Sequence, residues 1–187
     1  MYKICQTEQS SNRQRDLEQG LLRMMQKRRY EDISVSDLCQ HLQIPRRAFY
    51  RYFSDKEGAL YSLIDHTLAD FFKIPLSDKK SRGTAIGDLD LFFLFWYERK
   101  DLLDALEHSR LSGILVERAN NFALREGYMP RQLLGVSSQV QSMAMAFSLC
   151  GLMSMILRWH HEGFVLSPGE MTRIAINLLT NPLISSH

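Results

Sequence analysis

The chain has 187 residues, of which 45% are hydrophobic and 24% charged, and its formal net charge is +2. These values are typical of a globular protein and exclude extensive disorder away from the chain ends. The small basic excess gathers at Arg46, Arg47, Arg51 and Lys56, which suits a protein that docks one small patch on a polyanion.

The cysteines and the apolar stretches favour a cytoplasmic protein. Cys5, Cys39 and Cys150 are widely spaced, which argues against a disulfide framework and against a zinc site with paired ligands. The first fifteen residues lack an apolar segment of signal-peptide length. The most apolar stretch, residues 143–157, is shorter than the ~20 residues that cross a bilayer. We therefore predict that it is a buried helix and that the protein does not insert into a membrane.

The first part of the chain predicts three helices. Residues 1–10 are expected to be a frayed tail, followed by a helix from Asn12 to about Arg29 with apolar residues at helical spacing. Ser34 with Asp37 three residues later is a capping box that starts a second, short helix. Pro45 ends the turn after it, and a third helix is expected to continue to Phe53. These helices are assigned to a first domain, residues 1–58, in which the second and third helices and the turn between them form a helix-turn-helix.

The remainder, residues 59–187, is predicted to form a second, helical domain. Residues 74–87 are expected to form a linker or mobile loop, because they hold Pro, Ser and Gly without a period. Two helices are predicted within 100–126, a long helix from about Arg131 to His161, and a last helix started by the Ser167–Glu170 capping box. Almost no segment alternates like a strand, so the predicted fold class is all-α.

The third helix carries the most informative pattern. At 100° per residue, Arg46, Tyr50, Arg47 and Arg51 fall on one arc, whereas the opposite arc is apolar and aromatic. Guanidinium groups bond bidentately to guanine O6 and N7 or to phosphate, and a phenol can reach a phosphate oxygen. An ordinary solvated face is the alternative reading of such a helix. We predict a recognition helix, because the capping box, the turn and the arginine arc coincide.

The stretch SVSDLCQHLQIPRRAFYRYFSDKEGAL resembles the DNA-binding domain of the tetracycline-repressor (TetR) family of bacterial transcriptional regulators. The resemblance covers about residues 12–60 and departs from the family pattern at Gln43, where a glycine is usual. A left-handed residue other than glycine costs roughly 1–2 kcal/mol there, unless the turn differs locally. The resemblance implies DNA-backbone contacts from Ser34 or Val35 and from four further residues: Ser36, Tyr50, Tyr52 and Lys56. It assigns base reading to three arginines: Arg46, Arg47 and Arg51.

The resemblance also implies that residues 1–58 are the DNA-binding domain and that residues 59–187 form a regulatory domain that dimerises and often holds a small apolar effector. Small and apolar residues on the long and last helices predict a four-helix dimer interface; they are Ala144, Ser148, Gly151, Met171, Ile174 and Leu178. The alternative is that these stripes belong to the core of one chain. Candidate effector contacts are aromatic, Met and His side chains, with plain core packing as the alternative: Phe92, Phe93, Trp96, His108, Met143, Phe147 and Trp159.

An enzyme and a metal centre are both disfavoured. No Gly-rich phosphate loop, HExxH motif or nucleophile elbow occurs. His160 and His161 point about 100° apart on a helix, so we expect no metal, and no cofactor is implied. The predicted function is a dimeric TetR-type regulator, a ligand-responsive repressor that binds a palindromic operator in double-stranded DNA. The alternative is a TetR-like coactivator or adaptor that acts through a protein partner without an effector.

Overall fold

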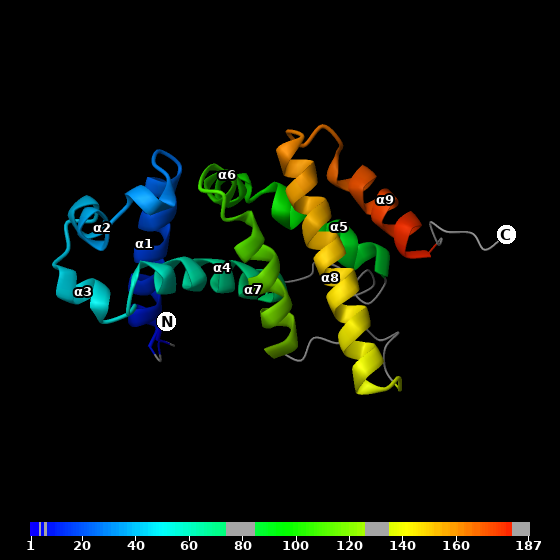
Figure 1. Ribbon diagram of the computed structural model, residues 1–187, viewed down its shortest axis with the longest axis horizontal. Coiled ribbons are helices and arrows are strands. Elements are labelled where there is room, and N and C mark those ends of the chain that lie inside the picture. The colour runs from blue at the N-terminus through cyan, green and yellow to red at the C-terminus, as the bar shows by residue number, and fades with distance from the viewer. Residues whose placement is uncertain (4, 6, 74–84, 126–134, 181–187) are drawn as a thin grey trace. The chain divides into compact units, whose positions relative to one another are not determined.

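A computed structural model describes the chain except residues 4, 6, 74–84, 126–134 and 181–187 (Figure 1). In the described residues every regular element is helical, apart from one isolated antiparallel bridge between Tyr2 and Phe53. The all-α prediction is confirmed. The contacts divide the chain into two compact units, one of residues 1–70 and 101–128 and the other of residues 71–100 and 129–187.

The first unit begins with the three predicted helices. α1 is Glu8–Met25, α2 is Val35–His41 and α3 is Arg46–Tyr50, with a short 3₁₀ helix, η1, at Tyr30–Asp32. The helix α1 starts earlier than the predicted Asn12, because the Thr7 side chain caps it by accepting a hydrogen bond from Ser10 N. α3 is also shorter than expected, since the chain turns at residues 51–53.

Three further helices complete the first unit: α4 (Lys56–Lys73), α6 (Lys100–His108) and α7 (Ser112–Arg125). The Arg15 guanidinium on α1 donates two 2.9 Å hydrogen bonds to the Asp70 carboxylate on α4. The first unit thus extends past residue 58 and includes α6 and α7. The end of the DNA-binding domain at residue 58 stays a prediction.

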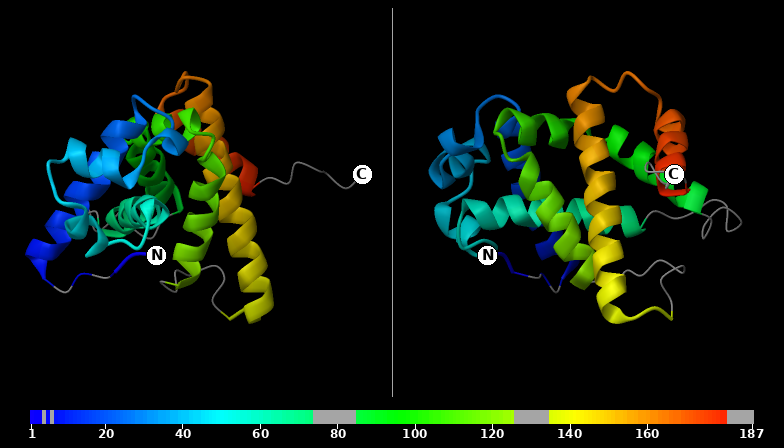
Figure 2. Two further views of the ribbon diagram at one scale, coloured as in Figure 1. Left: turned by 60° about the vertical axis from the view of Figure 1, so that its left-hand side comes forward. Right: turned by 45° about the vertical axis from the view of Figure 1, so that its right-hand side comes forward.

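The second unit consists of α5 (Ala85–Tyr97), α8 (Ser138–His161) and α9 (Pro168–Thr180). The helix α5 contacts both α9 and α8, and Figure 2 shows α5 beside α9. Its Phe93 and Trp96 side chains are fully buried, and Phe93 meets Trp159 of α8 edge-on at 5.9 Å between ring centroids. An apolar, aromatic α5 is therefore the core of this unit.

The limits of α8 follow from local capping. The helix starts at Ser138, where the Ser137 side chain caps it; the predicted start at Arg131 lies outside the described residues. Gly163 ends it with a φ of 77°, and the amide of the next residue, Phe164, donates to Trp159 O, as in the common glycine-ended C-cap. Ser167 and Glu170 then form the predicted capping box of α9. By length and composition alone, α8 is the one described helix that can cross a membrane.

Candidate nucleic-acid interface

The turn between α2 and α3 is fixed by backbone hydrogen bonds. Ile44 N donates to Cys39 O at 2.9 Å and Gln43 N donates to Gln40 O at 3.1 Å, which is the Schellman pattern of a helix end. Gln43 has a φ of 54°, so it occupies the left-handed position that glycine favours. The chain accepts this local cost of roughly 1–2 kcal/mol and keeps the tight turn.

The inner arc of α3 anchors the helix. Phe49 and Phe53 are essentially inaccessible to solvent, and their ring centroids lie 5.2 Å apart. Phe49 also meets the Tyr50 ring edge-on at 5.4 Å. Burial of the two phenylalanines fixes the rotation of α3 about its own axis, and this rotation decides which side chains face solvent.

The opposite arc of α3 is exposed. Arg46, Arg47 and Arg51 are all accessible, and the Tyr50 side chain is 43% exposed. Arg46 Nη2 donates a 3.1 Å hydrogen bond to the Tyr50 hydroxyl, and this bond raises the pKa of the Arg46 guanidinium above its ordinary value. Three cations and a phenol thus project from one side of a short, anchored helix, an arrangement that can meet phosphates and base edges in a DNA groove.

The two serines at the start of α2 differ in what they can offer. The Ser34 hydroxyl accepts a bond from Asp37 N and donates to the Asp37 carboxylate, so the predicted capping box is present. The bonds that Ser34 donates lower the pKa of the Asp37 carboxyl. The Ser34 hydroxyl is therefore already engaged, whereas Ser36 is exposed. Contacts of the two serines with the DNA backbone stay predictions.

The resemblance implies that Tyr52 contacts the DNA backbone, and this contact stays a prediction. The Tyr52 side chain is buried, with 7% of its surface exposed, and its ring packs against Phe53. The residue after the arginine arc therefore belongs to the core, and little of its side chain remains for a contact with DNA. The reason is rotational: Tyr52 lies on the inner arc of the wheel, next to the phenylalanine anchors.

Lys56 has partners within the chain. Its ammonium donates to Tyr30 O at 2.5 Å and to Ile33 O at 2.6 Å, and lies 4.0 Å from the centroid of the Tyr30 ring. Desolvation lowers the pKa of Lys56 below its ordinary value. The side chain thus ties the start of α4 to the segment between α1 and α2. A contact between Lys56 and a DNA phosphate stays a prediction. In such a contact the same ammonium would bond to the phosphate and to the two carbonyl oxygens.

We expect Lys56→Ala to lower the free energy of unfolding by about 1–3 kcal/mol, because hydrogen bonds from a charged donor contribute about this much. Urea denaturation of the variant and the wild type measures the difference. Lys27→Ala, which removes an exposed cation just after α1, is the matched control. Equal effects of the two substitutions would mean that the carbonyl contacts contribute nothing.

The candidate effector residues occupy both buried and exposed positions. Phe92, Trp96 and Trp159 are buried in the core of the second unit, as the alternative of plain packing expects. His108 is exposed at the end of α6 in the first unit. Met143 and Phe147 are 69% and 78% exposed on α8. The candidates are thus divided between buried core and exposed surface, because helical spacing alone does not separate the two, and an effector contact from any of them stays a prediction.

The candidate dimerisation residues are mostly accessible. Gly151, Ile174 and Leu178 are exposed, and Ala144 and Ser148 are half-buried. Met171 is buried within the chain. Beside Gly151, the same side of α8 exposes three apolar side chains: Val140, Met143 and Phe147. Two of these, Met143 and Phe147, were expected to line a pocket.

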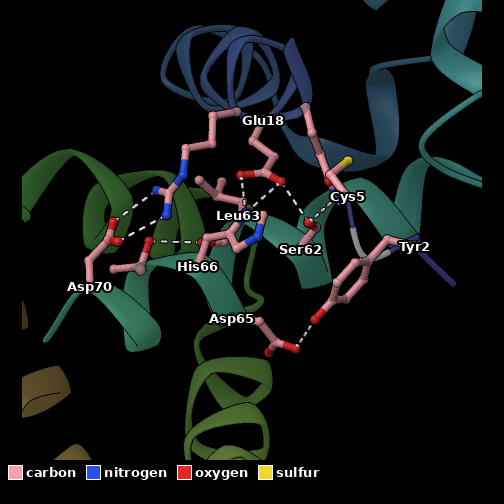
Figure 3. A network of polar contacts seen from close by, with 11 residues as sticks. Tyr2, Cys5, Glu18, Ser62, Leu63, Asp65, His66 and Asp70 are labelled. Carbon is pink, nitrogen blue, oxygen red and sulfur yellow. Dashed lines mark hydrogen bonds and ion pairs between the residues drawn. The ribbon is translucent and has the colours of Figure 1, made fainter. Parts of the chain in front are cut away.

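The contacts of residues 1–3 are not predicted by the sequence, from which we expect residues 1–10 to be a frayed tail. Lys3 N donates to Tyr52 O and Ser54 N donates to Met1 O, each at 3.0 Å. The Tyr2 hydroxyl donates to the Asp65 carboxylate on α4 (Figure 3). This segment therefore packs against the chain directly after α3. A short polar stretch has no periodicity from which such pairing can be predicted.

Residues 20–60 match the family model described as bacterial regulatory proteins, tetR family. No curated protein matches the chain. Among solved structures, the fatty acid degradation regulator FadR from Bacillus halodurans is similar with 14% identity and a TM-score of 0.58, over 92% of this chain and 97% of that one.

Two other solved structures share the fold. The dihydroxyacetone kinase operon activator DhaS has 18% identity and a TM-score of 0.55, over 89% of this chain and 93% of that one. A tetR-family transcriptional regulator from Streptomyces coelicolor has 17% identity and a TM-score of 0.53, over 88% of this chain and 78% of that one. At these identities the likeness establishes the fold.

Proposed function

We propose that the protein is a transcriptional regulator that binds duplex DNA as a homodimer in the cytoplasm. Two findings support this: residues 20–60 match the family model of the tetR regulatory proteins, and the chain shares its fold with solved structures of such regulators. The observation that carries the proposal is the orientation of α3, with Phe49 buried and Arg46, Arg47 and Arg51 exposed. The alternative of an ordinary solvated face predicts no sequence preference, and DNA binding tests it.

In this proposal α3 is the recognition helix and lies in the major groove of one half-site. Arg46 and Arg47 read bases, since guanidinium forks match the O6 and N7 acceptors of guanine. Arg51 contacts either a base or a phosphate. Tyr50 has two roles: its hydroxyl holds the Arg46 guanidinium, and its exposed ring lies where a phosphate can accept a bond from the hydroxyl.

The dimer interface is proposed on the exposed apolar stripe of α8 together with Ile174 and Leu178 of α9. The stripe consists of Val140, Met143, Phe147 and Gly151, which lie within about 80° of one another on a helical wheel. Apolar surface left in water is unfavourable at about 25 cal/mol per Å², so a second copy that covers the stripe is stabilised. Four helices then meet, two from each subunit.

A membrane is a less suitable partner for α8 than a second subunit. The side of α8 opposite the stripe is already covered within the second unit, where Met145, Met153 and Ile156 are buried. A bilayer-spanning helix exposes apolar residues all round. The one-sided exposure of α8 therefore supports a protein–protein contact, although its length and composition alone also fit a membrane span.

Ligand-responsive repression is the finer form of the proposal, and a regulator that acts through a protein partner without an effector is the second candidate. The second candidate is supported by the predicted effector residues, which are divided between buried core and exposed surface. DhaS, which has the same fold, is described as an operon activator. In the ligand-responsive form, a small molecule binds better to a state that does not fit the operator and so releases DNA.

Selection from a pool of random duplexes tests the proposed function directly. We expect the purified protein to enrich an inverted repeat whose half-site centres lie about 34–36 Å apart or at a multiple of this distance, because a two-fold dimer presents two recognition helices. Sequencing of the enriched pool gives the result. A pool that stays random after several rounds would contradict sequence-specific binding, and a single unrepeated site would contradict the symmetric dimer.

A further inference from the structure

We propose that residues 1–3 form a strap that positions the C-terminal end of the recognition helix, with Tyr2 as its positioning residue. The inference rests on the proposed function, which assigns α3 to DNA. Beyond that function, it assigns a role to Tyr2, which is distant from α3 in sequence. Tyr2 would not touch DNA and would act through the backbone that follows Arg51. The residues involved all lie in the first unit of the chain.

The strap pairs with the chain where α3 ends. Lys3 N donates to Tyr52 O and Ser54 N donates to Met1 O, and between these bonds Tyr2 faces Phe53 in an antiparallel bridge. These bonds hold the residues that directly follow the exposed Arg51. Because α3 has only five helical residues, its last turn has few hydrogen bonds of its own, and outside partners contribute correspondingly more to its order.

Tyr2 fastens the strap to the body of the first unit. Its hydroxyl donates to the Asp65 carboxylate (Figure 3). This carboxylate is 3% exposed and also accepts bonds from Arg118 of α7, including a 2.9 Å bond from Nε. Burial raises the pKa of Tyr2 to about 12, and the bond to Asp65 adds to the shift. The phenol therefore stays protonated at neutral pH and remains a donor. One buried carboxylate thus joins the strap, α4 and α7.

Gly58 provides an independent sign that the strap is built into the fold. A Cβ atom at this position, in the first turn of α4, would lie 2.4 Å from Met1 O and 2.8 Å from Met1 C. Both contacts are with backbone atoms, which cannot rotate away as the end of a flexible side chain can. The strap can approach this closely only because residue 58 has no side chain.

The two ends of α3 are therefore fixed by different means. The Schellman turn at Gln43 sets the entry into the helix, and the strap holds the exit at Tyr52 and Ser54. A helix held at both ends presents its arginines in one orientation before DNA arrives, which raises affinity for the matching sequence by lowering the ordering cost. Loosening the exit is expected to reduce discrimination between sequences more than attraction to DNA in general.

Two variants loosen the strap without touching the arginines. Tyr2→Phe removes only the hydroxyl that reaches Asp65, and Gly58→Ala places a methyl group against the Met1 backbone. Tyr61→Phe removes a hydroxyl of α4 that donates to the Glu57 carboxylate at 2.9 Å and does not reach the strap. Gly113→Ala adds a methyl group in the first turn of α7, where nothing lies within 4 Å. These last two variants are the matched controls.

The first readout is amide hydrogen exchange at Lys3 and Ser54, which needs no DNA. We expect exchange about tenfold or more faster in Tyr2→Phe and Gly58→Ala than in the controls, because local opening of the strap becomes easier. The second readout is the ratio of the dissociation constants for a scrambled duplex and the selected duplex. We expect this ratio to fall severalfold in both variants and to stay unchanged in both controls.

The outcomes separate the strap from the proposed function. Unchanged exchange in both variants would overturn the strap itself. Faster exchange with an unchanged ratio would overturn its positioning role, since the strap would then be a structural link only. A wild-type protein with no sequence preference at all would overturn the proposed function, and the positioning role with it, whatever the exchange rates.

Discussion

The Phe147→Asp variant is expected to be a monomer at concentrations at which the wild-type protein is a dimer. Phe147 is 78% exposed on α8, and Met143 beside it is 69% exposed. A carboxylate at this exposed position stays in water in a single subunit, so folding should be preserved. In the dimer it would lie buried against its symmetry mate, and an unpaired buried charge costs several kcal/mol.

Analytical ultracentrifugation across a concentration series measures the effect. Leu124→Asp, which places the same charge at an exposed leucine of α7, should leave the dimer intact. Gly151→Trp provides a second test, because a Cβ atom at Gly151 meets nothing within 4 Å in its own chain. Because Gly151 is also exposed, we expect a bulky side chain there to point into solvent in a single subunit and to clash with a partner. Dimers that persist in both Phe147→Asp and Gly151→Trp would place the interface elsewhere.

The loss of the dimer should also weaken DNA binding strongly. In a dimer, the second half-site is bound in an effectively intramolecular step, which raises overall affinity by about 10²–10⁴ over one module. Phe147→Asp should therefore bind a single half-site as well as the wild type does and lose most of the gain from the second half-site. This pattern distinguishes loss of assembly from loss of the recognition helix.

Arg46→Ala and Arg47→Ala are each expected to cost about 1–3 kcal/mol in binding to the selected duplex and to relax the base preference at one position per half-site. Both side chains are exposed, so folding stability should change little. Fluorescence anisotropy on the selected duplex and on single-base variants of it gives the values. Arg173→Ala removes an exposed cation from α9, outside the helix-turn-helix, and controls for net charge.

Two results would contradict base reading by Arg46 and Arg47. If Arg46→Ala and Arg47→Ala weaken all duplexes equally and only make the salt dependence shallower, the two side chains contact phosphates and not bases. If neither substitution has any effect, the exposed arc of α3 does not meet DNA.

Local signals in the sequence predicted much of the fold. The capping boxes at Ser34 and Ser167 involve residues three apart, and such pairs can be recognised without knowledge of the fold. The outward arc of α3 was predicted for the same reason, since a helical wheel needs only the helix itself. The left-handed Gln43 was one of two options that the sequence left open.

The features that the sequence could not predict depend on partners distant in the chain. Lys56 donates hydrogen bonds to the backbone carbonyls of Tyr30 and Ile33. The direction of a backbone carbonyl cannot be predicted from a pattern of side chains. Tyr2 depends on Asp65, which is distant in sequence. Met143 and Phe147 illustrate a different limit, because an apolar stripe looks the same whether it is covered by its own chain or by another one.

The arginine side of α3 is expected to read base sequence, and selection of DNA by a variant that lacks two of the arginines tests this most directly. The selection from random duplexes is repeated with the Arg46→Ala, Arg47→Ala double variant beside the wild type, under identical conditions. We predict that the wild type enriches an inverted repeat and that the double variant enriches no defined sequence, although it remains a folded dimer. Enrichment of the same inverted repeat by both proteins would contradict the claim.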